Sequence, residues 1–370
     1  MLKVLHIVGK MDMAGLETFL MNFYRNIDRN QIQFGFIPLS AAKGYYDEEI
    51  VSLGGEVIYP PHRYDWKKPK EFKTWFDSFL RQSDFSILHS HNGGAASIVL
   101  PIAKKHGLVT IVHSHNTGMM KDKPFVNQIR RINQRLGFKY ADMFFACSNE
   151  AGKYMFGNRE FKIINNAIDI SKFEYSESTR NRVRASIGLR NEEITIGTIG
   201  RLSPPKNPHM TISILNELKN KGIPFKFIWV GTGEMKDEID RQIIENGLSE
   251  QIIMLGPRND VNEILQAMDI FVFPSLWEGL GIVAIEAQAA GLPTICSDQV
   301  PKQAAVTELC SYVSVNDLDG WVKSIEFRIN NPVIRQLHTS EIRECGFDIH
   351  EEAKKLCTLY NQLASAGERK

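Results

Sequence analysis

The sequence alternates short apolar runs with longer amphipathic stretches, and this pattern occurs in two series along the chain. The apolar runs of the first series cover residues 4–8, 33–38, 87–91, 109–113 and 143–147, and those of the second cover 194–200, 225–230, 252–256, 270–274 and 293–296. Buried strands that alternate with amphipathic helices are typical of parallel sheets covered on both faces. The pattern therefore predicts an α/β fold of two tandem Rossmann-like domains, with a ligand cleft between them.

A chain of 370 residues exceeds what one hydrophobic core usually supports, which agrees with two domains. We expect an N-terminal domain over 1–170 and a C-terminal domain over 194–345. The intervening stretch, 171–193, is dense in Ser, Arg, Glu and Asn and is predicted to be a linker. Apolar positions at helical spacing predict a last helix within 346–370, which we expect to pack back toward the N-terminal domain.

Composition narrows the class of protein. Lys and Arg number 44 against 43 Asp and Glu, a balance that excludes a bulk polycationic surface for nucleic acid. The five cysteines are odd in number and lie among apolar residues, as expected of free thiols in a reducing cytoplasm. The apolar start is too short for a signal peptide, and no run reaches the roughly 18 apolar residues of a membrane span. We expect a cytoplasmic protein that is at most peripheral to the membrane.

Two carboxylates, Glu278 and Glu286, stand eight positions apart and are joined by a small-residue turn and an apolar run. If a helix begins near Gly281, its open amide end points at whatever Glu278 holds, and Glu286 lies about a turn and a half further along. That arrangement suits a sugar on a diphosphate, with Glu278 on the sugar hydroxyls, amides on the phosphate and Glu286 on a ribose diol. The alternative is an amphipathic helix with two solvated acids.

Two cations, Arg201 and Lys206, share the loop that follows the first strand of the second series. They can converge on one diphosphate if the loop doubles back, because open sheets bind ligands at the carboxyl ends of their strands. The alternative is a solvated loop with two surface cations. Gly231 and Gly233 end the next strand, a weak signal that also fits a tight turn. Gly15, after the first strand of the chain, would let backbone approach a phosphate.

Two His-Ser-His triplets, 89–91 and 113–115, stand at predicted strand ends. In an extended chain each histidine pair points to one face, so a metal site of four imidazoles is one interpretation. No carboxylate or cysteine stands at ligand spacing beside either triplet, and we expect no metal. We favour His115 facing the cleft and hydrogen-bonding the transferred sugar or its leaving oxygen. A core histidine satisfied by backbone remains the alternative.

The segment 121–139 carries six cations against one acid, interleaved with apolar residues. A basic amphipathic helix of this kind can rest on anionic lipid or on a lipid-linked phosphate. Lys121, Lys123, Arg130 and Arg131 are the candidate contacts to an acceptor or a membrane. An ordinary solvated helix face is the alternative.

Taken in order, several of these motifs together resemble glycosyltransferase family 4. They are the 200–207 loop, Gly231 to Glu234, Gly256 after a strand, residues 273–275, and the pair Glu278 and Glu286. The resemblance spans nearly all of residues 1–345. In the first domain, residues 115–116, 146–148 and 165–169 look like the bacterial exopolysaccharide and capsule branch of that family.

The resemblance implies a GT-B fold whose second domain holds a nucleotide-sugar donor and whose first domain holds the acceptor. By position, Arg201 and Lys206 would bind the donor diphosphate, Glu278 the sugar hydroxyls and Glu286 the ribose, and His115 would contact the sugar. The further donor contacts implied are Gly15, Gly231, Gly233, Arg258, Gly279, Leu280 and Gly281. One departure is that the family often has Gly-Gly where this chain has Ala14 before Gly15.

We therefore expect a retaining glycosyltransferase that moves a sugar from a nucleotide-diphosphate sugar to a hydroxyl of a glycan acceptor. The family branch favours a UDP-sugar as donor and a polyprenyl-diphosphate-linked oligosaccharide as acceptor, with no obligatory metal or other cofactor. Two alternatives stay open: a nucleotide-sugar epimerase or hydrolase of the same fold, and a non-catalytic subunit of a glycosyltransferase pair.

Overall fold

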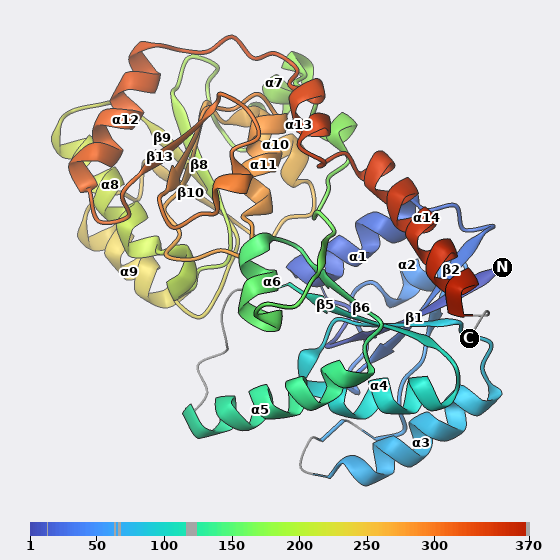
Figure 1. The fold of residues 1–370 in the computed structure, drawn as a ribbon. Coiled ribbons are helices and arrows are strands. Elements are labelled where there is room, and N and C mark those ends of the chain that lie inside the picture. The colour runs from blue at the N-terminus through green and yellow to red at the C-terminus, as the bar shows by residue number, and fades with distance from the viewer. Residues whose placement is uncertain (13, 63, 66–67, 116–123, 368–370) are drawn as a thin grey trace. The chain divides into compact units, whose positions relative to one another are not determined.

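The structure of the protein, a computed structural model, describes residues 1–12, 14–62, 64–65, 68–115 and 124–367. The chain forms two compact units (Figure 1). Unit 1 comprises Met1–Ile168 and Gly346–Lys370, and unit 2 comprises Asp169–Cys345. Each unit contains one parallel sheet with helices on both faces, so the α/β fold with two Rossmann-like domains is confirmed.

Unit 1 is built on a parallel sheet with the strand order β3-β2-β1-β4-β5-β6-β7. Its strands are β1 (Leu2–Val8), β2 (Ile32–Pro38), β3 (Glu56–Val57), β4 (Ile87–Ser90), β5 (Val109–Ser114), β6 (Met143–Ala146) and β7 (Lys162–Ile163). Its helices are α1 (Gly15–Asn26), α2 (Asp47–Ser52), α3 (Pro69–Gln82), α4 (Ala96–Lys105), α5 (Pro124–Gly137), α6 (Asn149–Phe156), α14 (Ile349–Gly367) and the short 3-10 helices η1 (Gly93–Ala95) and η2 (Phe138–Tyr140).

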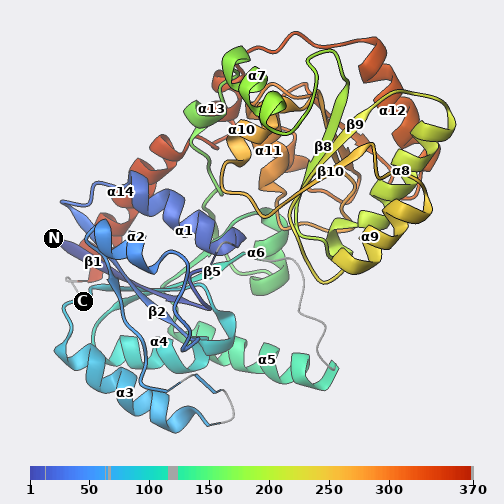
Figure 2. The same ribbon diagram turned by 180° about the vertical axis from the view of Figure 1, so that it is seen from behind.

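The two faces of this sheet carry separate apolar cores because side chains alternate along each strand. Val4 and Val8 of β1 pack in one core with α1 and α14. Leu5 and Ile7 pack in the other core with α3 and α4. Seen from behind, α1 and α14 lie on one side of the sheet and α3 and α4 on the other (Figure 2). The last helix of the chain is thus part of unit 1.

Unit 2 repeats this architecture with the strand order β10-β9-β8-β11-β12-β13, again all parallel. Its strands are β8 (Thr195–Ile199), β9 (Lys226–Val230), β10 (Ile252–Gly256), β11 (Ile270–Phe273), β12 (Thr294–Ser297) and β13 (Cys310–Val313). Its helices are α7 (Glu177–Ser186), α8 (Pro208–Asn220), α9 (Lys236–Glu245), α10 (Val261–Ala267), α11 (Ile282–Ala289), α12 (Leu318–Asn330), α13 (Thr339–Glu344) and the 3-10 helices η3 (Ile170–Phe173), η4 (Pro204–Lys206) and η5 (Lys302–Ala304). One apolar core joins α8, α9 and α12 to the sheet, and α10, α11 and α13 lie on the opposite face (Figure 1).

The strand orders place a topological switch point in each unit, between β1 and β4 in unit 1 and between β8 and β11 in unit 2. Loops that leave the carboxyl ends of these two neighbouring strands diverge to opposite faces of the sheet, and open α/β sheets bind ligands there. The fold thus directs attention to the loops after β1 and β4, and after β8 and β11.

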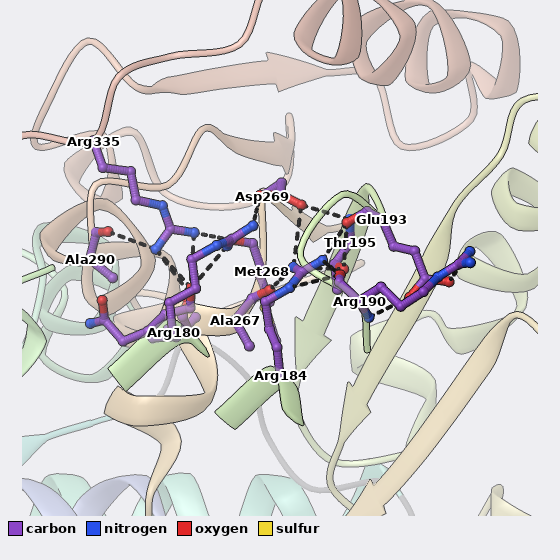
Figure 3. Close-up of polar contacts among 12 residues, drawn as sticks. Arg180, Arg184, Arg190, Glu193, Thr195, Ala267, Met268, Asp269, Ala290 and Arg335 are labelled. Atoms are coloured by element: carbon purple, nitrogen blue, oxygen red, sulfur yellow. Dashed lines mark hydrogen bonds and ion pairs between the residues drawn. The ribbon is translucent and has the colours of Figure 1, made fainter. Parts of the chain in front are cut away.

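The stretch 171–193, expected to be a linker, instead contains η3 and α7 and belongs to unit 2. Arg180 of α7 donates to the carbonyls of Gln266 and Met268 and pairs with Asp269 at 2.7 Å. The buried Arg184 donates to Ala267 O at 2.7 Å, in the network of Figure 3. The polar composition that suggests a linker supplies guanidinium groups that satisfy buried backbone carbonyls.

The predicted strand positions agree with the observed ones to within a few residues, but three strands were not predicted. β3 and β7 have only two residues each, and together with β13 they form edges of the sheets. β3 and β7 are too short to contain the apolar run from which the prediction was made, and β13, with four residues, is interrupted by Ser311. Among the described residues, no helix combines the length and apolarity that crossing a membrane requires.

Candidate functional site

The loop after β8 folds against the loop after β11, at the switch point of unit 2. Leu276 N–H donates to Pro205 O at 2.8 Å. Asn207 Nδ2 donates to Pro274 O at 3.1 Å. Asn207 has a left-handed backbone with φ of 53°, which turns the chain from η4 into α8. These bonds fix where the last residue of η4, Lys206, points.

Lys206 forms an ion pair with Glu278, its Nζ lying 2.6 Å from Glu278 Oε1. The side chains are 27% and 12% exposed, so the pair is largely shielded from water. The same ammonium lies 4.7 Å from the centroid of the Phe273 ring, a cation–π contact. The structure thus brings together the two residues that the sequence assigns to the diphosphate and the sugar.

Arg201, on the same loop, lies with its side chain 71% exposed and pairs with Glu234 Oε2 at 3.2 Å. Glu234 belongs to the turn after β9, which also contains Gly231 and Gly233. The two predicted phosphate cations therefore stand on one loop, each beside a different carboxylate.

Gly231 and Gly233 have a structural reason to be glycine. A Cβ at Gly231 would lie 2.1 Å from Gly200 O, and its φ of +131° disfavours any side chain. A Cβ at Gly233 would lie 2.2 Å from Leu202 O. The backbones of the two loops are also hydrogen-bonded, with Leu202 N–H donating to Thr232 O at 3.0 Å. These glycines hold the loop of Arg201 and Lys206 in place.

Helix α11 begins at Ile282, as the prediction of a helix start near Gly281 requires. Gly281 caps it with a left-handed backbone, φ +86°, and a Cβ there would press on Phe273 and Val300 at 3.1 and 3.2 Å. The amide end of the helix therefore follows directly after residues 278–280, beside the ion pair of Lys206 and Glu278.

Glu286 lies on α11, half-buried, and its carboxylate has no hydrogen bond or ion pair within the described part of the chain. Burial raises the pKa of Glu286 to about 7. A half-buried carboxylate without a protein partner is suited to accept hydrogen bonds from a ligand.

Arg258, the remaining predicted donor contact of unit 2, is engaged by its neighbour in sequence. Its Nε lies 2.8 Å and its Nη2 2.5 Å from the two carboxylate oxygens of Asp260. This bidentate pairing lowers the pKa of Asp260 and occupies the fork of Arg258. A phosphate would have to compete with Asp260 for it.

In unit 1, Gly15 is the first residue of α1, and Ala14 at the N-cap makes no side-chain hydrogen bond. A Cβ at Gly15 would meet nothing within 4 Å. Among the described residues no side chain therefore caps the first amides of α1, and the glycine leaves open space beside them.

Five histidines gather on one face of the unit 1 sheet, in β1, β4 and β5 and at their carboxyl ends. They are His6, His89, His91, His113 and His115. His115 is partly exposed and the others are buried. Burial lowers the pKa of His6 and of His115 to about 3, and burial together with neighbouring imidazoles lowers the pKa of the remaining three well below the ordinary value. All five rings are neutral at physiological pH.

The rings are joined into two hydrogen-bonded chains. His6 Nδ1 lies 3.0 Å from His91 Nε2, and His91 Nδ1 lies 2.8 Å from His115 Nε2. In the second chain the Tyr360 hydroxyl lies 2.7 Å from His89 Nδ1, and His89 Nε2 lies 3.2 Å from His113 Nδ1.

Two groups of three imidazoles have ring nitrogens within 4.8 Å of one another: His6, His89 and His91, and His91, His113 and His115. These are the residues that could hold a metal ion in the described part of the chain. The nitrogens that form the two chains are, however, at hydrogen-bond distance from one another, and the groups contain no carboxylate to balance a cation's charge. The arrangement therefore fits a hydrogen-bonded network.

His6 and Tyr360 were not singled out from the sequence. His6 lies in register with His89 across the pair of β1 and β4, so a histidine inside the apolar run 4–8 was the signal available. Tyr360 comes from α14, and no local pattern connects it with β4. Lys121 and Lys123 lie outside the described residues, and the side chains of Arg130 and Arg131 in α5 are likewise not described.

Two family models match the chain, one for each half. The model described as Glycosyltransferase Family 4 matches residues 13–172, and the model described as Glycosyl transferases group 1 matches residues 179–335. EpsF of Bacillus subtilis, named as a glycosyltransferase, is 28% identical over 97% of this chain and 96% of its own length.

A second relative is the UDP-Gal:alpha-D-GlcNAc-diphosphoundecaprenol alpha-1,3-galactosyltransferase of Escherichia coli, 26% identical over 76% of either chain. Among solved structures, HepE of Anabaena in complex with UDP superposes with a TM-score of 0.76 over 100% of both chains, at 18% identity. That likeness concerns the fold, which is the GT-B fold.

Proposed function

Because the chain belongs to glycosyltransferase family 4, we propose that it transfers a sugar from a UDP-sugar to a hydroxyl of a glycan acceptor, with retention of anomeric configuration. The observation that carries this proposal is the ion pair of Lys206 and Glu278 at the switch point of unit 2. A cation and a carboxylate fixed side by side match the phosphate end and the hydroxyl end of a sugar diphosphate.

The donor binds first through the groups of unit 2. Glu278 accepts hydrogen bonds from sugar hydroxyls, while Lys206 contacts the diphosphate. The amides at the start of α11 and the backbone of Gly279, Leu280 and Gly281 meet phosphate or sugar. Glu286, which has no protein partner in the described chain, accepts from the ribose diol. Before the donor arrives, the two charges of the ion pair neutralise each other.

The chemical difficulty in glycosyl transfer is the departing diphosphate, which gains negative charge while the anomeric carbon becomes cation-like. Arg201, Lys206 and the helix amides stabilise that charge electrostatically, so we propose that no metal ion is required. Arg201 is 71% exposed and held by an exposed carboxylate at 3.2 Å, so its side chain can turn to the ligand at small cost.

Retention follows if the acceptor hydroxyl approaches on the face that the diphosphate leaves. A phosphate oxygen then accepts the proton of that hydroxyl, and exclusion of water on binding favours transfer over hydrolysis. Glu278 is paired with Lys206, which makes it a poor candidate for a covalent nucleophile. Gly15 and His115 of unit 1 are proposed to contact the diphosphate and the sugar.

The choice of donor and acceptor is supported by the relatives. HepE was crystallised with UDP, and the name of the Escherichia coli enzyme gives UDP-Gal as its donor and a diphosphoundecaprenol-linked sugar as its acceptor. We propose a UDP-sugar and a lipid-linked oligosaccharide for this chain, used in exopolysaccharide or capsule synthesis at the cytoplasmic face of the membrane.

A thermal-shift screen of UDP, other nucleoside diphosphates and their sugars, with and without a chelator, tests the donor. UDP-sugars should raise the melting temperature, since a ligand of the folded state stabilises it, and the chelator should not alter the shift. Incubation of the purified chain with the stabilising sugar nucleotide and a polyprenyl-diphosphate oligosaccharide then tests the reaction. A new glycan with the donor's anomeric configuration is expected. Formation of an epimer, release of free sugar only, or turnover only with a partner chain would contradict the proposal.

A further inference from the structure

The chain of rings formed by His6, His91 and His115 runs from the core of unit 1 to a partly exposed end. His115 Nε2 is joined to His91, and its other nitrogen, Nδ1, has no partner among the described residues. Nδ1 is therefore the atom that His115 offers to a ligand.

A neutral imidazole carries one N–H and one unprotonated nitrogen. Each nitrogen–nitrogen contact needs one donor and one acceptor, so the position of the proton on one ring fixes it on the next. His6, His91 and His115 therefore all carry the proton on Nε2, or all carry it on Nδ1. In the first arrangement His115 Nδ1 accepts a hydrogen bond, and in the second it donates one.

The buried end of the chain favours the first arrangement. His6 Nε2 is buried and has no hydrogen-bond partner among the described residues. The ring of His6 packs against two aromatic rings: it is tilted by 57° to Phe34 with the centroids 4.3 Å apart, and it is stacked on Phe36 at 5.2 Å. The tilt against Phe34 allows the edge of the His6 ring to face aromatic electrons, which attract an N–H group and repel an unprotonated nitrogen. The proton of His6 is better placed on Nε2.

The second chain of rings has the same direction for an independent reason. If His89 carried its proton on Nδ1, the hydroxyl proton of the buried Tyr360 would have no acceptor in the described part of the chain. The hydroxyl therefore donates to His89 Nδ1, and His89 Nε2 donates to His113. His113 Nε2 then ends this row of rings without a polar partner in the described part of the protein, and its ring is T-shaped to that of Phe19 at 5.3 Å.

We propose that His6 and His91 are positioning residues that hold His115 as the Nε2–H tautomer, so that Nδ1 accepts a hydrogen bond from a hydroxyl of the donor sugar. A phosphate oxygen can only accept, so it does not pair with this atom. His115 thus recognises the sugar and leaves the diphosphate to other groups. The identity of the ligand rests on the proposed function, whereas the tautomer does not.

Nitrogen-15 NMR of the full chain labelled at histidine measures the tautomer directly, without a ligand. His115 should show a protonated Nε2 and an unprotonated Nδ1, and a His115→Ala protein assigns its signals. A protonated Nδ1 would overturn the inference. Because this measurement uses the unaltered protein, it determines the direction of the hydrogen bonds among His6, His91 and His115 even if a variant fails to fold.

Two matched variants test the link to activity. His6→Phe removes the buried end of the hydrogen-bonded row that contains His115. Tyr360→Phe removes the buried end of the row formed with His89 and His113. Each change deletes one buried hydrogen bond. His6→Phe should give mixed tautomers of His115. It should also lower kcat/KM by about tenfold, the value of one hydrogen bond, measured with the UDP-sugar that the wild-type protein turns over fastest. Tyr360→Phe should change neither the tautomer of His115 nor kcat/KM.

Equal effects of the two variants on kcat/KM, or no effect of His6→Phe, would overturn the positioning role. If the wild-type protein turns over no UDP-sugar, the proposed function fails. The tautomer measured in the ligand-free protein still decides whether the hydrogen bonds among the histidine rings have the inferred direction.

Discussion

The ammonium of Lys206 lies 2.6 Å from Glu278 Oε1, although 72 positions separate the two residues in sequence. They meet because β8 and β11 are neighbours in the sheet of unit 2, and the loops that leave their carboxyl ends touch. The pair is largely shielded from water, so each charge depends on the other in the ligand-free protein.

Replacing Lys206 with alanine should lower turnover by about a hundredfold or more, by analogy with the loss of one donor that stabilises a developing charge. The measurement is kcat with a saturating UDP-sugar, alongside the melting temperature. Lys236→Ala is the matched control, since Lys236 is an exposed lysine of unit 2 paired only with Asp240 among the described residues. Full activity of the Lys206→Ala enzyme would refute the role of Lys206.

The affinity for UDP should depend on pH through Glu286. Its pKa is raised to about 7 by burial, and only the ionised carboxylate accepts hydrogen bonds from both ribose hydroxyls. Affinity should therefore rise as pH increases, by about tenfold between about pH 6 and about pH 8, with release of a proton on binding. Isothermal titration calorimetry measures both. In Glu286→Gln the affinity for UDP should depend on pH only through the UDP phosphate itself. An unchanged pH profile in this variant would show that Glu286 does not contact the ligand.

The same shift fixes the sign of a stability effect in the ligand-free protein. The pKa of Glu286 in the folded state, about 7, is higher than the ordinary value of 4.5. The folded state therefore binds more protons between these values, and the stability that Glu286 contributes is complete below 4.5 and is lost as pH rises through about 7. Urea denaturation of wild type and Glu286→Gln over this range should differ in that direction.

The glycines should divide into structural and ligand-facing ones. In Gly231→Ala the new Cβ would lie 2.1 Å from Gly200 O at a φ of +131°, so stability should fall by about 3 kcal/mol or more. In Gly15→Ala the new Cβ meets nothing within 4 Å, so stability should change by less than about 1 kcal/mol while donor turnover falls. Urea denaturation and kcat/KM test both. Unaltered turnover in Gly15→Ala would contradict its placement near the diphosphate.

Much of the candidate site in unit 2 could be predicted because it is encoded locally. Glu278, Gly281 and Glu286 lie on one turn and helix, and the small-residue turn before the apolar run indicates a helix start near Gly281, which is where α11 begins. The pairing of Lys206 with Glu278 could not be derived, because it depends on which strands are neighbours. The chain formed by Tyr360, His89 and His113 joins α14 to β4 and β5, and no spacing rule connects them.

The fold and the linker were both predicted from the distribution of apolar residues. That signal located the major strands correctly, but it made the prediction of a linker over 171–193 wrong. Buried parallel strands leave continuous apolar runs in the sequence, so the major strands were found. Helix α7 has few apolar positions, and it is held by guanidinium groups, among them those of Arg180 and Arg184. A hydrogen-bonded arginine inside a domain and a solvated arginine in a linker have the same sequence signature.

Arg184 should be the most important side chain of α7 for stability. It is fully buried and donates to Arg190 O, Glu193 O, Ala267 O and Thr195 Oγ1. Arg184→Leu leaves buried carbonyls without donors and should destabilise unit 2 by about 3 kcal/mol or more, measured by urea denaturation. Arg182→Leu on the same helix removes a side chain 60% exposed, paired with Glu263, and should change stability by less than about 0.5 kcal/mol. Similar losses in the two variants would show that the network contributes little.

Helix α5 should mediate contact with anionic lipid or a lipid-linked phosphate. Ile132 and Leu136 are 53% and 49% exposed and are four positions apart, which places them on one face of the helix. Exposed apolar residues within a segment of six cations favour an anionic surface. Reversing Arg130 and Arg131 to Glu should weaken cosedimentation with phosphatidylglycerol vesicles by at least about tenfold, since each cation near such a surface is worth about 1 kcal/mol.

Reversing Lys73 and Lys153 to Glu is the control for net charge. These exposed residues lie elsewhere in unit 1, so the same change in charge should have a smaller effect. Equal losses would indicate attraction by net charge alone, and unchanged binding of the first variant would remove the membrane role of α5.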